Sequence, residues 1–115
     1  ASGSVDSTTG TSTAAAFTID LRSGTPIVSN APSMQNARQF CNSVILPNGE
    51  VMVIGGNTSG RKFNDTGSIL TPEIWNPGTR QWRAVAPMNV PRNYHSLALL
   101  LADGRVWAGG GGLSG

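Results

Sequence analysis

The stretches LPNGEV (residues 46–51) and LADGRV (residues 101–106) decide the fold of this chain, because they are two copies of one β-hairpin. Each carries an Asn-Gly or Asp-Gly pair between apolar residues, and such pairs favour type I′ turns, whose central residues need positive φ. Each also leads to a glycine-rich segment, Gly55-Gly56 in the first copy and residues 109–112 in the second. The chain therefore contains a tandem β repeat.

The sequence before each hairpin repeats as well. Met34 aligns with Met88 and Arg38 with Arg92 at a spacing of 54 residues, whereas the hairpins themselves are 55 residues apart. We therefore predict one extra residue in the second copy, within residues 97–101.

A second pair of strands is expected between the two hairpins. Ile74-Trp75 precedes the turn NPGT (residues 76–79), and QWRAV (residues 81–85) follows it. Residues 17–28 read as a weaker version of the same pair, broken by SGTP at residues 23–26. Four strands that repeat at about 50 residues are typical of the blades of kelch-type propellers.

We therefore predict an all-β chain, a kelch-type β-propeller fragment with one complete four-stranded blade plus half blades on either side. Residues 1–13, mostly Ser, Thr, Gly and Ala, are expected to form a flexible arm. The outer hairpin of a preceding blade is expected at residues 14–30, the complete blade at 31–88, and the inner hairpin of the following blade at 89–115. A single eight-stranded β-sandwich is the alternative, which the tandem repeat disfavours.

Composition limits the partners. The net charge is +2 and no run of Lys or Arg exists, so we predict no nucleic-acid partner. The longest apolar stretch, residues 97–102, is too short to span a membrane. Cys41, the single cysteine, is interpreted as a small buried apolar side chain. Because repeat units bury their faces against neighbours, we expect either the remaining blades of a parent chain or self-association to complete the propeller.

Three recurring residue types are interpreted as structural. The tryptophans Trp75, Trp82 and Trp107 are expected to pack between sheets. Arg38 and Arg92 are expected to bridge to the backbone or to a carboxylate of the next blade. The glycine run 109–112 is interpreted as a close crossing of strands, since no helix pattern follows it for a phosphate loop.

The stretch RNYHSLALLLADGRV (residues 92–106), followed by the glycines and Leu113, resembles the copper radical oxidases related to galactose oxidase and glyoxal oxidase. FND (residues 63–65) leading into LTPEIW (residues 70–75) resembles the same family, and the likeness covers residues 32–115. The resemblance implies a mononuclear copper on the propeller axis, bound by two tyrosines and two histidines, one tyrosine being cross-linked to a cysteine. Such enzymes oxidise primary alcohols or aldehydes and reduce dioxygen to hydrogen peroxide, so the resemblance implies a small alcohol, aldehyde or sugar as the substrate.

By this resemblance, Tyr94 would be the axial copper ligand and catalytic base, and His95 an equatorial copper ligand. Phe40 and Phe63 match aromatic walls of the substrate pocket. Oxygen and nitrogen donors of these types suit Cu(II). Because adjacent residues of a regular strand face opposite sides, Tyr94 and His95 can share one metal only where the backbone is irregular, at the start of a strand.

The chain has one tyrosine and one histidine, so it cannot supply four ligands by itself. We expect copper only in a complete protein and no turnover by the chain alone. Cys41 aligns with His95 one blade earlier and is not interpreted as the cross-linked cysteine, while Ser114 stands where the family often has a cysteine. The alternative function is a non-catalytic kelch propeller that binds carbohydrate, a cell surface or a protein. The resemblance implies an extracellular or cell-surface location.

Overall fold

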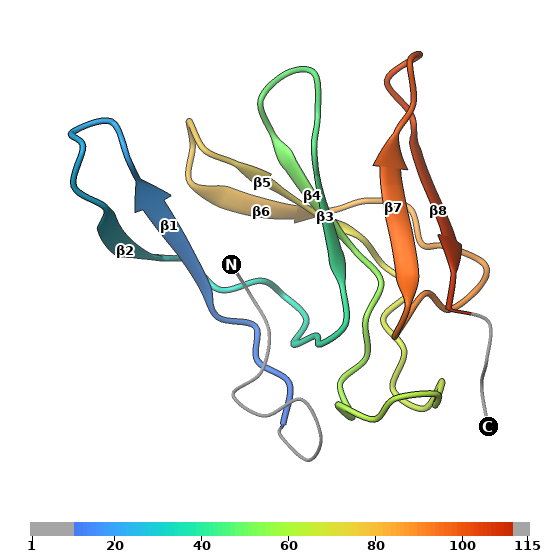
Figure 1. The fold of residues 1–115 in the computed structure, drawn as a ribbon. Helices are drawn as coiled ribbons and strands as arrows, with labels where there is room; N and C mark the ends of the chain where they lie inside the picture. Colours follow the sequence, from blue (N-terminus) through green and yellow to red (C-terminus); the bar gives the residue numbers. More distant parts are fainter. Residues whose placement is uncertain (1–10, 112–115) are drawn as a thin grey trace.

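The computed structural model describes residues 11–111, and all regular elements within this range are strands. They form three antiparallel sheets that follow one another along the chain, a hairpin, a four-stranded sheet and a second hairpin. Figure 1 shows the two hairpins on either side of the central sheet. No helix in the described range is long and apolar enough to cross a bilayer. The predicted arm falls mostly outside the described residues.

The strands, in chain order, are β1 (Ala16–Asp20), β2 (Ile27–Ala31), β3 (Asn42–Ile45), β4 (Val51–Ile54), β5 (Glu73–Asn76), β6 (Gln81–Ala84), β7 (Ser96–Leu100) and β8 (Val106–Gly110). The central sheet has the order β3-β4-β5-β6, so each strand pairs with its neighbour in sequence. The predicted fold class, a four-stranded sheet between two hairpins in an all-β chain, is confirmed.

The core lies on both faces of the central sheet. Val44, Ile54 and Ile74 point from one face and Val53 and Trp75 from the other, and all five are 5–8% exposed. Side chains alternate between the faces because successive strand residues point to opposite sides. The central sheet therefore packs against a neighbour on each face.

A buried ion pair fixes the chain just before β3. Arg38 Nη2 lies 2.5 Å from Glu73 Oε2, and both side chains are fully buried. The guanidinium also donates to the carbonyl oxygens of Gly55 and Thr71, at 3.0 Å each, and Glu73 accepts from the backbone N–H of Gln35 at 2.6 Å. The predicted bridge from Arg38 to the backbone is confirmed, but its carboxylate belongs to the same sheet and not to the next blade.

The two inner hairpins, β3–β4 and β7–β8, have the same length. The pairs that close their turns, Ile45 with Val51 and Leu100 with Val106, are each six residues apart. No residue has therefore been added inside residues 97–101, and the predicted place of the extra residue is wrong. A sequence comparison cannot place such an insertion, because only the strand pairing shows which residues face each other.

The extra residue lies in the segment before the second inner strand. Two equivalent bonds mark the start of these segments in the two copies, Arg38 Nη1 to Gly55 O and Arg92 Nη1 to Gly110 O, both 3.0 Å. We call residues 39–41 the first leading turn and residues 93–96 the second leading turn. The second has four residues where the first has three, and it ends with the first residue of β7.

Candidate metal centre

The four predicted site residues form one aromatic cluster. The rings of Tyr94 and His95 stack with centroids 3.8 Å and planes 26° apart. Phe40 and Phe63 each meet the Tyr94 ring edge-on, with centroids 5.1 Å apart, and Phe63 lies 5.9 Å from the His95 ring. The cluster joins three segments, since Phe40 precedes β3, Phe63 belongs to the β4–β5 loop, and Tyr94 and His95 precede β7.

The backbone of this cluster is irregular. Among the described residues four that are not glycine have positive φ, and three of them are Phe40 (63°), Phe63 (54°) and His95 (67°). Such conformations cost about 1–3 kcal/mol each and gather at functional sites. The left-handed conformation of His95 lets its ring lie over that of Tyr94. The expectation of an irregular backbone at this pair is confirmed.

Phe40 and His95 occupy the same structural position in their leading turns. Each lies two residues before the equivalent pair of its hairpin, Asn42 with Ile54 and Leu97 with Gly109. Both also have positive φ, 63° and 67°. The predicted match of Cys41 with His95 is therefore wrong, because it assumed that the extra residue came later in the chain.

Asn93 ties the second leading turn to the β4–β5 loop. Asn93 is only 4% exposed. Its side-chain Nδ2 donates to Asp65 Oδ1 at 3.0 Å and to Ser68 Oγ at 2.9 Å. This contact holds the loop that carries Phe63 against the turn that carries Tyr94. Asn93 was not among the residues predicted from the sequence, and its place directly before Tyr94 is the one signal that could have indicated it.

The β4–β5 loop is also fixed from within. Asn57 is fully buried, and its side-chain amide donates to the carbonyl oxygens of Arg61 at 3.1 Å and Asn64 at 3.3 Å. Its Oδ1 accepts from the backbone N–H of Gly60 at 2.9 Å. One buried side chain therefore shapes the loop on both sides of Phe63.

Strand β8 crosses close behind the Tyr94–His95 pair. A Cβ atom on Gly110 would lie 3.2 Å from His95 O, and one on Gly111 would lie 3.0 Å from Tyr94 O. Both glycines have positive φ, at 76° and 68°. The predicted close crossing is confirmed at these two residues, while Gly112 lies outside the described range.

The donors of this cluster fit half of a copper site. The phenol oxygen of Tyr94 and an imidazole nitrogen of His95 are ligands that Cu(II) takes in a tetragonal array. The described residues hold no group of three or more His, Cys, Asp or Glu side chains that could complete the set. Two further donors must therefore come from elsewhere if copper binds here.

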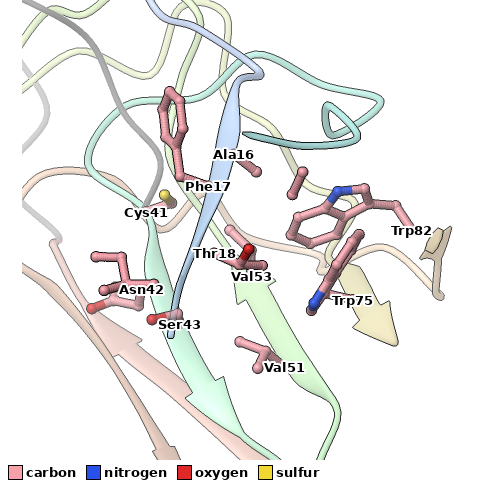
Figure 2. A pocket seen from close by; sticks show the side chains of 12 residues that line it. Ala16, Phe17, Thr18, Cys41, Asn42, Ser43, Val51, Val53, Trp75 and Trp82 are labelled. Atoms are coloured by element: carbon pink, nitrogen blue, oxygen red, sulfur yellow. The ribbon is translucent and has the colours of Figure 1, made fainter. Parts of the chain in front are cut away.

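A groove lies away from this cluster, between β1 and the central sheet (Figure 2). It has a volume of about 470 Å³, and its lining includes Phe17, Cys41, Trp75 and Trp82 but none of the four cluster residues. The Trp75 and Trp82 rings pack with centroids 5.3 Å apart. Trp82 also donates a hydrogen bond from Nε1 to the backbone oxygen of Pro32 at 2.7 Å. These contacts support the interpretation of both tryptophans as packing residues.

Comparison with known proteins places the chain in one group. Residues 9–113 match the family model described as the glyoxal oxidase N-terminus. Galactose oxidase of Gibberella zeae is 46% identical over 79 residues, which are 69% of this chain and 12% of that enzyme. An aldehyde oxidase of Arabidopsis thaliana is 32% identical over 97 residues, which are 80% of this chain and 16% of that protein. The chain thus spans a small part of these relatives.

A solved structure agrees with the sequence matches. A fungal alcohol oxidase in complex with copper superimposes with a TM-score of 0.85 at 41% sequence identity. The match covers 93% of this chain and 23% of the oxidase. Nearly the whole chain therefore has the fold of one part of a copper-binding alcohol oxidase.

Proposed function

Because the chain belongs to the glyoxal oxidase N-terminus family, we propose that it forms part of a copper radical oxidase propeller. In the complete protein this propeller would oxidise primary alcohols or aldehydes with dioxygen and release hydrogen peroxide. The observation that carries the proposal is the stacked Tyr94–His95 pair, which presents a phenol and an imidazole side by side on a strained turn.

Each residue of the pair has a separate role in this proposal. Copper, when bound, would supply the redox chemistry that removes two electrons from the substrate. Tyr94 Oη would hold the metal and accept the proton of the substrate hydroxyl, as a general base positioned at the reacting centre. His95 would hold the metal through one ring nitrogen, and its stacking on Tyr94 keeps both donors on one side of the turn.

Phe40 and Phe63 would form the walls of the substrate pocket. Both rings meet Tyr94 edge-on at 5.1 Å, from the two segments that flank the second leading turn. Apolar walls at this place would exclude water from the phenol oxygen and orient a small substrate beside it.

The partners of the chain are the other blades of a parent protein. Apolar side chains are exposed on the two hairpins that flank the central sheet, β1–β2 and β7–β8, namely Ile19 (57%), Val28 (64%), Leu97 (59%) and Leu99 (55%). Further blades would cover these residues, as sheets do in repeat architectures. The same blades or a further domain would supply the missing ligands, so the chain alone would be inactive. An extracellular or cell-surface location stays a prediction.

The proposal is tested in the full-length natural protein that carries this chain, loaded with copper. Tyr94→Phe removes the phenol oxygen, and hydrogen peroxide production from primary alcohols or aldehydes is expected to fall roughly 10²- to 10⁴-fold. His95→Ala removes one donor, and copper affinity measured by competition with a chelator is expected to fall at least tenfold.

Cys41→Ser is the matched control, because Cys41 neighbours Phe40 in the chain but lines the groove beside β1. It should leave copper content and peroxide production unchanged. A full-length protein that binds no copper and oxidises neither alcohols nor aldehydes would refute the oxidase and support a propeller that only binds.

A further inference from the structure

A cation stands over the candidate metal centre. Lys62 Nζ lies 5.2 Å from the centroid of the Tyr94 ring. None of the four ion pairs among the described residues includes Lys62. The acidic residue three positions further along, Asp65, accepts a hydrogen bond from Asn93. The ammonium beside Tyr94 therefore has no ion-pair partner in the described part of the chain.

The loop holds Lys62 at this place. On one side of it, the Arg61 carbonyl accepts from the buried Asn57 amide at 3.1 Å. On the other side, Phe63 has a positive φ of 54° and meets the Tyr94 ring edge-on. Lys62 thus extends from a segment whose two neighbouring residues are both anchored.

We infer that Lys62 is a specificity-determining residue that favours substrates carrying a carboxylate beside the aldehyde or alcohol. This inference rests on the proposed function. A small aldehyde held at Tyr94 between the two phenylalanine rings would lie close to the ammonium, which is 5.2 Å from the centroid of the Tyr94 ring. A carboxylate there gains Coulomb attraction that a neutral substrate lacks, and we expect this to raise affinity roughly tenfold, which lies between the values for full solvent and for a protein surface.

The reaction on such a substrate balances as in the proposed function. The hydrated aldehyde loses two electrons and two protons and becomes a carboxylic acid. Dioxygen takes up both electrons and both protons and leaves as hydrogen peroxide. Lys62 takes no part in these transfers, so removing its charge should change substrate binding more than the chemical step.

The experiment compares two aldehydes in the copper-loaded, full-length natural protein. Glyoxylate carries a carboxylate and glycolaldehyde is neutral, and both have two carbons. Lys62→Met keeps the apolar stem and removes the charge, while Lys62→Glu reverses it. Arg61→Met is the matched control, since it removes the same charge from the neighbouring exposed residue.

Lys62→Met is expected to lower the ratio of kcat/KM for glyoxylate to that for glycolaldehyde about tenfold, chiefly by raising KM for glyoxylate. Lys62→Glu should lower the ratio further, and Arg61→Met should change it less than twofold. The preference of the unmodified protein should shrink as NaCl is raised, because salt screens an exposed charge.

The two proposals fail in different ways. If Lys62→Met oxidises both aldehydes with the unmodified ratio, the role of Lys62 is refuted and the oxidase stands. The same holds if Arg61→Met lowers the ratio as much as Lys62→Met. If the unmodified protein oxidises neither aldehyde and no primary alcohol, the proposed function is refuted and the role of Lys62 with it.

Discussion

The two inner hairpins of this chain are alike from turn to glycines and differ in the few residues before them. The first leading turn has three residues and carries Phe40, whereas the second has four and carries Tyr94 and His95. Both turns pass through a positive φ at the same position. The difference teaches that the second turn presents a phenol beside an imidazole where the first has Gln39 and Phe40, and that one added residue separates this pair from the preceding arginine.

The arginines that precede the two turns differ as well. Arg38 is fully buried and forms an ion pair with Glu73, which belongs to β5 of its own sheet. Arg92 makes the equivalent bond to Gly110 O, but β5 of the central sheet has no counterpart beside β8 among the described residues. The central sheet is therefore stabilised by a buried ion pair. The second hairpin has the bond from arginine to carbonyl oxygen but, among the described residues, no carboxylate beside the arginine.

The largest expected effect comes from breaking the buried Arg38–Glu73 ion pair of the central sheet. Glu73→Gln would leave the Arg38 guanidinium buried without its carboxylate, and an uncompensated buried charge costs about 3–5 kcal/mol. We expect a marked fall in the denaturant midpoint of the full-length protein, which circular dichroism would measure. The hydrogen bonds that the backbone N–H groups of Gln35 and Asn36 donate to the carboxylate would also weaken.

Arg92→Met is the comparison for this substitution. It removes the recurring arginine where the described residues show a bond to Gly110 O and no carboxylate. We expect a cost of about 1 kcal/mol, as for an ordinary hydrogen bond. If Glu73→Gln and Arg92→Met lowered the free energy of unfolding equally, the two arginines would contribute equally to stability, and the contrast between the two sheets would be wrong.

The next largest effect concerns the extra residue. Deleting Asn93 gives the second leading turn the length of the first and joins Tyr94 directly to Arg92, as Gln39 is joined to Arg38, so the turn must change its course around Tyr94. The phenol and the imidazole should then no longer meet on one side of the turn. We expect copper affinity in the full-length protein to fall about 10- to 100-fold, measured by competition with a chelator.

Two variants separate the length of the turn from other effects of this deletion. Asn93→Ala removes the bonds to Asp65 and Ser68 but keeps four residues, and it should retain most of the copper affinity. An extra glycine after Gly104 lengthens the hairpin at its far end and should leave copper binding unchanged. If that insertion abolished binding while the deletion did not, the assignment of the added residue to the leading turn would be wrong.

The sequence predicted the strands well and the leading turns poorly, for one physical reason. Asn-Gly and Asp-Gly turns and alternating apolar residues are local signals, so the hairpins and the outer pair around Trp75 and Trp82 could be placed from them. The position of the extra residue depends on which strand residues pair, and pairing is not local. The same holds for the partner of Arg38 and for Asn93, whose contacts lie about 30 residues away in the chain.

The smallest expected effect is a difference in acid stability between the two hairpin turns. Glu50 bonds Arg83 of β6 and accepts from Asn48 Nδ2 at 2.6 Å, whereas the second hairpin has Arg105 at the same position. The hydrogen bonds from Arg83 and then Asn48 lower the pKa of Glu50 below its ordinary value of 4.5. A carboxyl whose pKa falls on folding stabilises the protein above pH 4.5, and this stabilisation is lost as the pH falls through the lowered pKa. In both Glu50→Gln and Arg83→Met, the denaturant midpoint should therefore fall less steeply below pH 4.5 than in the unmodified protein. If the midpoint of either variant had the same pH dependence as that of the unmodified protein, the Glu50–Arg83 ion pair would not stabilise the contact of the first hairpin with β6.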